Sequence, residues 1–546
     1  MKKLLLSLFI LSLLICTVFA ISASAAEIID SGSCGDNVTY TLDSDGLLRI
    51  EGSGIVDYCT FLEDEFIKSV VISSGVTEIG YNSFYSCPNL TSVKIENGLT
   101  TIQSGVFKNC ENLTSIELPA SITSVDTNFS NTAYYNDSSN WENGVLYIGT
   151  VLVKVQSTLS GAYSVKNGTT AISSYAFEGC TNLTDVIIPD TVTRIESTTF
   201  SGCSNLSSVT IHEGIKYIGS RAFEYCTSLK SVTLPDNLFM SIYAFLECSA
   251  LETVTFTTGN VKIYDWAFEG CENIKRVNIP SIDDWCNIDF SIANNPLQYG
   301  AELYVDSIPV GGILNIPQSV TRIKSCAFQS PSIHTIILPS SIESIDWAAF
   351  AGNSGLECVV IPPEVSNIDP EAFMSCPNVK IYGYVGSPAQ AYATENNIPF
   401  VDIEALDVYS VSFDANGGEN APESQSKYNS ISLKLTNLTP TRSGYKFKGW
   451  ATSTDGEVVY AGGDAFAENS DMTLYAVWEE ITTKPGDPNG DGTVNMKDAL
   501  VLRKYLAGWT VEGDEAALDV NGDGAVNMKD ALLLRKFLAG WQVELG

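Results

Sequence analysis

Oxygen-bearing side chains that could bind a metal ion occur in two copies of one motif near the end of the sequence. Each copy has acidic or amide side chains at positions 1, 3, 5, 9 and 12 of a twelve-residue loop, with glycine at position 6. Such a loop can close its oxygen atoms around a hard cation such as Ca2+, and the glycine permits the sharp turn. An Asx-rich turn without metal would explain one loop, but it does not explain two matched copies. We therefore expect two Ca2+ ions and no organic cofactor.

The expected Ca2+ ligands follow from the loop positions. In the first loop they are Asp487, Asn489, Asp491, Asn495 and Asp498, with the backbone carbonyl of Thr493. In the second loop they are Asp519, Asn521, Asp523, Asn527 and Asp530, with the backbone carbonyl of Ala525.

A helical pattern follows each loop. The apolar residues at helical spacing are Ala499, Leu502, Leu506 and Trp509 after the first loop, and Ala531, Leu534, Leu538 and Trp541 after the second. We expect these two stripes to pack against each other.

This pair of motifs resembles the type I dockerin domain of cellulosome subunits. The resemblance runs from Pro485 to the end of the sequence, and both loops end in aspartate rather than in the glutamate of an ordinary EF-hand. It implies an all-α domain over residues 487–546 and a cohesin module of a scaffoldin as the partner. The expected cohesin-binding residues are Met496, Lys497, Leu500, Arg503, Lys504 and Ala507 on the first helix, and Met528, Lys529, Leu532, Arg535, Lys536 and Ala539 on the second. A basic solvated face is the alternative explanation of the charge pattern. Because the two faces are nearly identical, either could dock the same partner after a half-turn.

A second, longer series of repeats occupies most of the chain. Apart from two interruptions, phenylalanine recurs every 22 or 23 residues from Phe84 to Phe373, as in IPDTVTRIESTTFSGCSNLSSVTI. A short, steady period predicts a solenoid in which each turn buries its apolar edge against the next. L-x-x-V-x-I and V-T-x-I are expected to form short strands, with phenylalanine and cysteine on the turn between them. The repeat resembles the Treponema pallidum-type leucine-rich repeat, which implies a β-rich solenoid over residues 67–403.

The interruptions and the ends of the solenoid contain further strand patterns. Residues 130–165 and 281–312 are expected to be hairpin-bearing enlargements of a turn. Each end of a solenoid exposes an edge that must be covered. We expect an N-terminal β cap over residues 27–66, with a hairpin pattern from Val38 to Val56, and a C-terminal cap of one helix and one strand over residues 386–403.

Residues 408–480 have three strand patterns separated by turn residues. They resemble a single Listeria-Bacteroides repeat, which implies a small α+β, ubiquitin-like module with a spacer role. The residues that carry this resemblance are Phe413, Asn416, Gly417, Gly418, Gly444, Tyr445, Phe447, Gly449, Trp450, Tyr475 and Trp478. Residues 481–486 are expected to link this module to the dockerin-like segment.

The first 25 residues have the pattern of a signal peptide, because Lys2 and Lys3 precede an apolar run from Leu4 to Phe19. No other stretch approaches 18 consecutive apolar residues, so we expect a secreted, extracellular protein without a transmembrane segment. Its 30 basic and 64 acidic residues give a net charge of −34. This charge makes nucleic acid a poor partner and favours solubility and cation binding.

The cysteines and histidines give little support for a catalytic or zinc site. Eight cysteines lie three residues after a repeat phenylalanine, as expected of small buried residues. The sequence has no C-x-x-C pair, and His212 and His334 stand alone, which argues against zinc and against a Ser-His-Asp triad. A glycosidase would need only two carboxylates, and nothing marks such a pair. We therefore expect a non-catalytic protein.

The outward side chains of L-x-x-V-x-I indicate what the solenoid could bind. If its valine and isoleucine point inward, the flanking residues point outward. They are mostly Ser and Thr, without aromatic rings on which a polysaccharide could stack, but Ile337, Cys358 and Val360 come together in the last repeats. We expect this patch to contact a protein or to be covered by the neighbouring domain.

These patterns predict a calcium-dependent, cohesin-binding subunit of a cellulosome-like complex. Its leucine-rich repeats would display a surface for an unknown protein or cell-surface ligand. The alternatives are a polysaccharide-degrading hydrolase with an unrecognised carboxylate pair, and a free adhesin.

Overall fold

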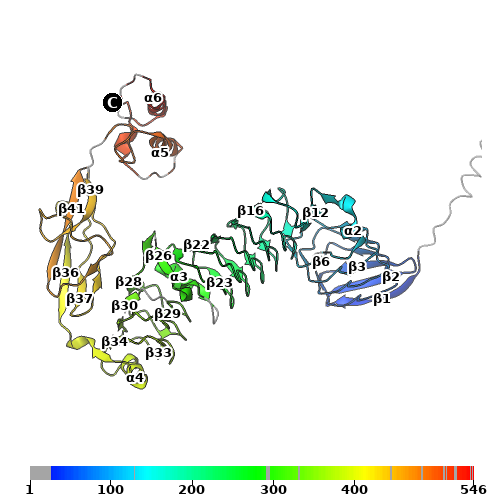
Figure 1. Cartoon of the computed structure of the whole chain (residues 1–546), viewed down its shortest axis with the longest axis horizontal. Coiled ribbons are helices and arrows are strands. Elements are labelled where there is room, and N and C mark those ends of the chain that lie inside the picture. Colours follow the sequence, from blue (N-terminus) through cyan, green and yellow to red (C-terminus); the bar gives the residue numbers. More distant parts are fainter. Residues whose placement is uncertain are drawn as a thin grey trace, which may run out of the picture. The chain divides into compact units, whose positions relative to one another are not determined.

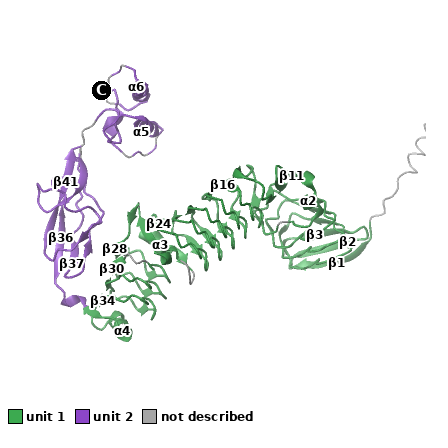
Figure 2. Ribbon diagram, in the orientation of Figure 1, with its two compact units in different colours: residues 1–401 green, residues 402–546 purple. Residues whose placement is uncertain are grey.

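The structure, a computed structural model, describes residues 26–546 except positions 128, 291–294, 306, 330–332, 443–444, 481–483, 508, 510, 512, 522–524, 542, 544 and 546. The expected signal peptide, residues 1–25, therefore lies outside the described residues, as do Asp523 and Gly444. The chain divides into two compact units, one ending at Val401 and the other beginning at Asp402 (Figure 2).

The first unit is a solenoid in which short strands lie side by side in two rows (Figure 1). The first row contains β3 (Leu47–Gly52), β5 (Ser69–Ile72), β7 (Ser92–Ile95), β9 (Ser115–Glu117), β14 (Gly161–Ser164), β16 (Leu183–Ile187), β18 (Ser208–Val209), β20 (Ser231–Leu234), β22 (Thr253–Phe256), β24 (Arg276–Ile279), β26 (Glu302–Val305), β28 (Gly312–Asn315), β30 (Ile333–Ile337), β32 (Cys358–Val360) and β34 (Lys380–Gly383). Successive strands within each sheet of this row pair in parallel.

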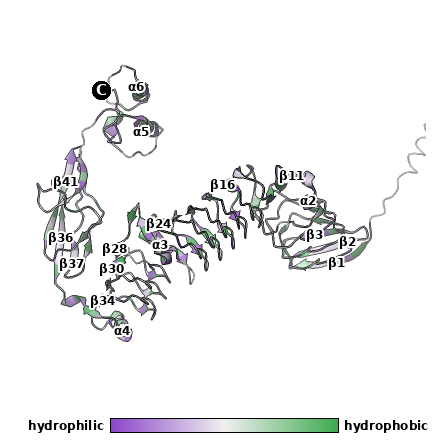
Figure 3. Cartoon of the chain, viewed as in Figure 1, coloured by the Kyte–Doolittle hydropathy of each residue, from purple (hydrophilic) through white to green (hydrophobic). Residues whose placement is uncertain are grey.

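Most strands of the second row come from the V-T-x-I segments or from segments at the same place in the turn. It contains β4 (Gly54–Val56), β6 (Val76–Ile79), β8 (Thr101–Ile102), β10 (Ser124–Val125), β13 (Val151–Val155), β15 (Ala171–Ile172), β17 (Arg194–Ile195), β19 (Tyr217–Ile218), β21 (Leu238–Met240), β23 (Val261–Ile263), β25 (Asp289–Phe290), β29 (Arg322–Ile323), β31 (Ser344–Ile345) and β33 (Asn367–Ile368). The β-rich solenoid expected from the sequence is thus confirmed. Hydrophobic and hydrophilic residues are interspersed along its strands (Figure 3).

The repeat phenylalanines form stacks through the solenoid. One stack joins Phe61, Phe84, Phe107 and Phe129, the next joins Phe177, Phe200, Phe223, Phe245 and Phe268, and the last joins Phe328, Phe350 and Phe373. Within the second stack the ring centroids are 4.9 to 5.6 Å apart. At the N-terminal end of the first stack, the ring of Tyr40 packs edge-to-face with Phe61. At the C-terminal end of the last stack, the ring of Tyr392 packs edge-to-face with Phe373. The two caps therefore extend the same aromatic core.

The repeat cysteines connect each turn to the one before it. Cys203 Sγ donates a hydrogen bond to the carbonyl oxygen of Phe177 at 3.1 Å, and Cys226 Sγ donates to that of Phe200 at 3.2 Å. The same bond recurs from Cys87, Cys110, Cys248, Cys271 and Cys376. At the equivalent position Asn353 donates through Nδ2 to Phe328 O at 2.6 Å. The thiol bond adds to the backbone bond that such a carbonyl already accepts, as Phe200 O does from Cys203 N at 3.1 Å, and it thereby ties one turn to the next.

Left-handed backbone conformations flank most of the stacked phenylalanines. The residue two positions before the ring has positive φ in these turns, as at Thr198 (58°) and Arg221 (56°), and so has the residue two positions after it. Glycine occupies the second of these positions at Gly179 and Gly202, where φ is 69° and 73°. Glycine adopts this conformation without steric cost, which explains its recurrence before the cysteine.

The N-terminal cap contains an antiparallel meander. β1 (Ile28–Gly35) pairs with β2 (Val38–Asp43), and β2 pairs with β3. The expected hairpin over Val38 to Val56 therefore ends at Gly52, because β4 leaves the meander and pairs in parallel with β6 of the second row. At the other end the cap consists of α4 (Pro388–Glu395) and β35 (Phe400–Asp402), followed by the short helix η3 (Ile403–Ala405).

The first interruption contains α2 (Ala133–Asn136), η1 (Ser138–Asn140), β11 (Trp141–Glu142) and β12 (Val145–Ile148). β12 and β13 form a hairpin, as expected. This hairpin separates two hydrophobic cores. Leu152 and Val155 belong to the core on one side, whereas Val151 and Val153 belong to the core on the other. Burial on both faces explains the continuous apolar run of this strand.

The second interruption contains more than a hairpin. It includes α3 (Ile282–Asn287), η2 (Pro296–Tyr299) and β27 (Ile308–Pro309), which pairs with β26. Helix α3 was not expected from the sequence. Its N-cap Ser281 accepts a hydrogen bond from Asp284 N, and Trp285 is fully buried against Phe256 and Phe290.

In the second unit, residues 408–480 form a mixed sheet in the order β37-β36-β41-β39. The strands of the module are β36 (Val408–Asp414), β37 (Gln425–Tyr428), β38 (Leu433–Lys434), β39 (Tyr445–Ala451), β40 (Ala465–Phe466) and β41 (Met472–Glu480). The described part of these residues contains no helix, so it shows the sheet of the expected α+β module and not its helical element.

Several residues of the Listeria-Bacteroides pattern have direct structural roles. Asn416 Nδ2 donates to the carbonyl oxygens of Thr454 and Ala476, at 2.7 and 3.0 Å. A Cβ atom at Gly418 would lie only 2.6 Å from Cζ2 of Trp478. Trp450 is fully buried and packs against Phe413. The pattern therefore specifies one turn and the core beneath it.

The C-terminal segment consists of α5 (Met496–Leu506), η4 (Glu515–Leu518) and α6 (Met528–Leu538). No helix in the described residues is long and apolar enough to cross a membrane.

We predict that Phe223→Ala lowers the free energy of unfolding of the solenoid by about 3–5 kcal/mol. Phe223 is fully buried, and its ring is stacked between Phe200 and Phe245. The substitution therefore removes two ring contacts and leaves a cavity. Chemical denaturation followed by circular dichroism measures the effect. Ser231→Ala, on an exposed strand position nearby, is the control and should change stability by less than about 0.5 kcal/mol. An equal loss from both substitutions would contradict the stacking account.

We also predict that the native protein has one rapidly reacting thiol at pH 8. The thirteen described cysteines are free, and Cys59 alone among them is exposed. Burial raises the pKa of Cys34 to about 11 and that of Cys203 to about 12, so these thiols stay protonated and unreactive at pH 8. Titration with Ellman's reagent should detect one thiol in the native protein and the others after denaturation. Cys59→Ser should remove the native signal, and rapid reaction of several thiols would contradict the burial of the repeat cysteines.

Candidate calcium loops and docking faces

The first candidate loop is closed by its own hydrogen bonds. Gly492 N donates to Asp487 Oδ2 at 2.8 Å, Asp491 N donates to Asn489 Oδ1 at 2.9 Å, and Asn495 N donates to Asp498 Oδ2 at 2.7 Å. Gly490 and Gly492 have φ values of 68° and 84°, which allow the tight path of the loop. The sequence therefore folds this segment into a compact turn directly before α5.

Two of the carboxylates in this loop are buried. Asp487 is 5% exposed and Asp498 is fully buried, and Asp487 Oδ1 has no hydrogen-bond partner. Burial raises the pKa of Asp498, and the charges of Asp487 and Asp491 raise it further, while the hydrogen bond from Asn495 N opposes them. A cation would supply the missing partner of Asp487 and offset this repulsion.

The oxygen donors fit Ca2+ by their chemistry, because carboxylate, amide and backbone carbonyl oxygens are the ligands that a hard cation prefers. The carboxylates do not converge, however. Among the described residues, no three carboxylate, histidine or cysteine side chains lie close enough together to hold an ion. Instead, Asn489 Nδ2 donates to Asp498 Oδ1 at 2.5 Å, and Thr493 N donates to Asp491 Oδ1 at 3.0 Å.

Similar contacts close the second loop where it is described. Asn521 N donates to Asp530 Oδ1 at 3.1 Å, Asn527 N donates to Asp530 Oδ2 at 2.8 Å, and Asn527 Nδ2 donates to the Ala525 carbonyl at 2.8 Å. Asp530 is fully buried, as Asp498 is. Asp519 precedes these residues at the end of η4, and Asp523 lies outside the described residues.

Both helices begin with the same capping box. Asn495 caps α5 and Asn527 caps α6, and in each case the aspartate three residues later bonds back to the cap. The expected last ligand of each loop is therefore also a helix-capping residue. This double role couples the conformation of the loop to the first turn of the helix.

The two helices pack through most of the expected stripe. Ala499, Leu502, Ala531 and Leu534 are buried in one cluster, with Leu506 and Leu538 at its margin. The expectation for the two tryptophans was wrong, since Trp509 is 65% exposed and Trp541 is 62% exposed. The helices end at Leu506 and Leu538, so both tryptophans leave the helical spacing.

The expected cohesin-binding residues lie on the exposed sides of the two helices. Met496 and Leu500 are 72% and 52% exposed, and Met528 and Leu532 are 73% and 52% exposed. The remaining side chains are also exposed, apart from the half-buried Lys536: Lys497, Arg503, Lys504, Ala507, Lys529, Arg535 and Ala539. Lys536 Nζ lies 5.8 Å from the ring centroid of Trp541. Sequence reasoning had placed this tryptophan in the core instead of at the edge of a candidate face.

The expected apolar patch on the solenoid is less open than the sequence suggested. Cys358 is only 7% exposed, and Ile337 and Val360 are half-buried. The register places Lys380 beside Cys358 and Tyr382 beside Val360, so longer side chains of β34 lie next to the patch. Burial raises the pKa of Cys358 to about 12. These residues do not form an open apolar surface.

One buried carboxylate pair bears on the hydrolase alternative. The charge of Glu196 helps to raise the pKa of Asp126, although burial of Asp126 is the main cause. Arg194 Nε and Ser124 Oγ both donate to Glu196 Oε1, at 2.9 and 2.7 Å, and Ser174 Oγ donates to Asp126 Oδ1. Each carboxylate is thus held by neighbouring side chains in a structural network.

Comparison with family models finds three matches. The model described as BspA type leucine rich repeat region matches residues 54–154, 169–292 and 312–384, which together exceed half of the chain. The Dockerin type I domain matches residues 485–539, and the Listeria-Bacteroides repeat domain matches residues 409–477. These matches confirm the three resemblances found in the sequence.

Solved structures also resemble this chain. A leucine rich cell surface protein from Faecalibacterium prausnitzii is 23% identical, with 67% of this chain and 97% of that chain covered and a TM-score of 0.28. A leucine-rich repeat protein from Bacteroides ovatus is 18% identical, with 67% and 98% covered and a TM-score of 0.31. The T. pallidum leucine rich repeat protein is 20% identical, with 35% and 86% covered and a TM-score of 0.19. The comparison with curated proteins returned no match.

We predict that Asp487→Ala weakens Ca2+ binding of the full chain at least tenfold at the first loop, because it removes the ligand at loop position 1. Isothermal titration calorimetry should show two binding events in the native chain and one in the variant. Glu515→Ala, which removes an exposed carboxylate outside both loops, is the control and should retain both events. Two unchanged binding events in Asp487→Ala would contradict the ligand assignment.

Proposed function

Because the chain belongs to the BspA-type leucine-rich-repeat family, we propose that its solenoid displays a binding surface and that its C-terminal segment attaches this surface to a partner. The type I dockerin match supports a cohesin module as that partner. In this proposal the protein is a secreted, extracellular and non-catalytic subunit of a cellulosome-like complex.

The observation that carries the proposal is the paired exposure of methionine and leucine on two equivalent helices. Met496 and Leu500 on α5 correspond to Met528 and Leu532 on α6, and all four side chains are more than half exposed. Exposed apolar side chains bordered by lysine and arginine are typical of a protein-binding site. The near-identical sequences give the partner two equivalent ways to dock.

Calcium has a structural role in this proposal. Asp498 and Asp530 cap the two docking helices and belong to the two candidate loops. Two Ca2+ ions, one in each loop, would fix these carboxylates and thereby the first turn of each helix. Metal binding would then supply free energy of folding, and removal of calcium would release the partner.

In this proposal the solenoid carries the binding surface that the C-terminal segment attaches to the partner. Within each row its strands pair mostly in parallel, one turn after another, so its surface is built from side chains on many turns. Such repeat surfaces bind extended partners. The carboxylates of Asp126 and Glu196 are occupied by Ser124, Ser174 and Arg194, so no observation favours the hydrolase alternative.

We predict that damage to one docking face lowers cohesin affinity only about twofold, because one of two equivalent orientations is lost. The variants are Met496→Asp with Leu500→Asp on α5, and Met528→Asp with Leu532→Asp on α6. Combining all four substitutions should abolish binding. Surface plasmon resonance with an immobilised type I cohesin, with and without chelator, measures these effects.

Glu515→Ala serves again as the control, because Glu515 lies on neither face. A loss greater than tenfold from the α5 substitutions alone would show that α6 is not an equivalent docking face. Full binding in the presence of chelator would contradict the role of calcium.

A further inference from the structure

The second row of strands changes its pattern in three consecutive turns. In most other turns a buried aliphatic residue occupies the first and fourth positions of V-T-x-I, as in Val192 to Ile195 and Val320 to Ile323. The three exceptional turns read NLFM from Asn237, NVKI from Asn260 and NIDF from Asn287. Asparagine replaces the first buried residue, and the next residue becomes the buried one. Leu238, Val261 and Ile288 are each no more than 3% exposed.

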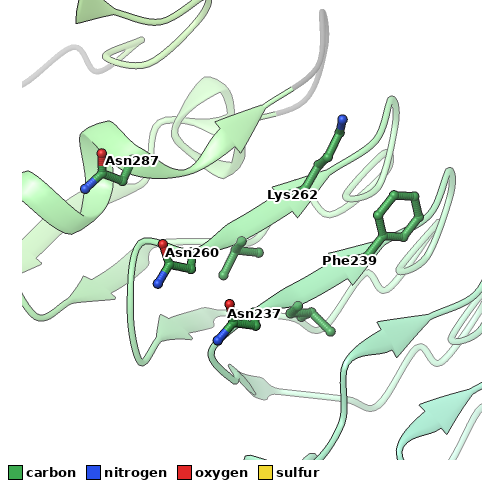
Figure 4. Close-up of a pocket in the computed structure, with 7 residues that line it drawn as sticks. Asn237, Phe239, Asn260, Lys262 and Asn287 are labelled. Atoms are coloured by element: carbon green, nitrogen blue, oxygen red, sulfur yellow. The ribbon is translucent and has the colours of Figure 1, made fainter. Parts of the chain in front are cut away.

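This change places three asparagines on the surface in one register. Leu238 pairs with Val261 and Lys262 pairs with Asp289, so each asparagine lies beside the next across neighbouring strands. All three side chains are exposed. In Figure 4 they lie one after another along one side of a shallow depression, with Phe239 and Lys262 on the other side. The volume of this depression is about 330 Å³, and its lining residues are Asn237, Leu238, Phe239, Asn260, Val261, Lys262 and Asn287.

Asp236 holds two of these amides in place. Asn237 Nδ2 donates to Asp236 Oδ2 at 2.5 Å, and Asn260 Nδ2 donates to Asp236 Oδ1 at 3.2 Å. Thr258 Oγ1 also donates to Asp236 Oδ1, at 2.6 Å. Because one carboxylate fixes neighbouring side chains, little conformational entropy is lost when a ligand bonds to them.

Aromatic rings continue along the same row of strands. Tyr217 pairs with Phe239 across β19 and β21, and their ring centroids are 5.7 Å apart. Tyr264, which is 37% exposed, lies 5.0 Å from Phe239 by the same measure. Apolar ring atoms and amide groups thus occur together on this surface.

Two of the charged groups beside these rings are paired with opposite charges. Lys262 Nζ lies 3.7 Å from Asp289 Oδ2, and Arg194 Nε lies 2.9 Å from Glu196 Oε1. The chain as a whole carries a net charge of −34. A polyanion would therefore be repelled, and the surface is complementary to an uncharged ligand.

We propose that the row of Asn237, Asn260 and Asn287, with Tyr217, Phe239 and Tyr264, binds a neutral polysaccharide chain. An amide both donates and accepts hydrogen bonds, as a sugar hydroxyl does. The faces of the rings pack against one another and, at Tyr217, against Arg194, so it is their outer edges that add apolar surface for the C–H groups of a pyranose. The asparagines repeat at the spacing of neighbouring strands, about 4.8 Å. One pyranose unit of an extended β-linked chain advances by a similar length, so successive units would meet equivalent groups.

This proposal concerns a different face from the L-x-x-V-x-I strands and does not depend on cohesin binding. The test is affinity gel electrophoresis of the full chain in gels that contain hydroxyethyl cellulose, glucomannan, xyloglucan or, as an anionic comparison, polygalacturonate. We expect at least one neutral polymer to retard the protein. Asn237→Ala combined with Asn260→Ala should weaken this binding at least tenfold, and Phe239→Ala should weaken it as well.

Asn367→Ala is the matched control, since Asn367 is an exposed asparagine on β33, a strand of the same row outside the three turns. It should bind as the native chain does. Unchanged cohesin binding and melting temperature would show that the asparagine variants are folded. The proposal is overturned if no neutral polymer retards the native chain, if only polygalacturonate does, or if the double asparagine variant is retarded like the native chain. It is also overturned if a protein ligand, rather than a polysaccharide, requires these asparagines.

Discussion

The contact between one turn of the solenoid and the next determines the rest of its structure. Each turn places a phenylalanine ring on the preceding ring, and a cysteine thiol donates to the carbonyl oxygen of the preceding phenylalanine. Neither contact is strong alone, but both recur at a fixed position of most regular turns, so they keep neighbouring strands in one register. A surface that spans several turns, such as the asparagine row, requires that constant register. The caps obey the same constraint through Tyr40 and Tyr392.

The sequence predicted the elements whose signal repeats. The spacing of phenylalanine and cysteine predicted the turns, and the duplicated loops predicted two equivalent helices with exposed methionine and leucine, because helix periodicity decides which side faces solvent. Periodicity failed where an element ends. Trp509 and Trp541 continue the apolar spacing of the sequence. The helices end at Leu506 and Leu538, however, so both rings are exposed. A residue beyond a helix end has no defined face, and its exposure cannot be deduced from spacing.

The candidate sites on the solenoid show how much of a surface can be predicted from the alternation of inward and outward side chains along a strand. Alternation correctly placed Ile336 and Val359 in the core, but it could not show that Cys358, on the opposite side, is also buried beside the side chains of β34. The asparagine row was present in the sequence as three departures from V-T-x-I, and it was missed because the outward residues were considered only for the other row of strands. Its pairing with Asp236 and with the aromatic rings depends on contacts between turns, which only a structure provides. Loop spacing likewise does not determine whether the carboxylates of a calcium loop converge, and among the described residues they do not.

The hairpin β12–β13 has a mechanical consequence. It contributes Leu152 and Val155 to one hydrophobic core and Val151 and Val153 to another, so the same strand bounds two cores of the solenoid. In a repeat protein, cooperativity is transmitted only between neighbouring turns. A force that pulls along the solenoid would therefore act on the two cores in series. The turns around the shorter N-terminal core could open while the turns around the longer core remained folded. The asparagine row lies over the longer core, so a ligand held there would stay bound while the turns around the shorter core extended.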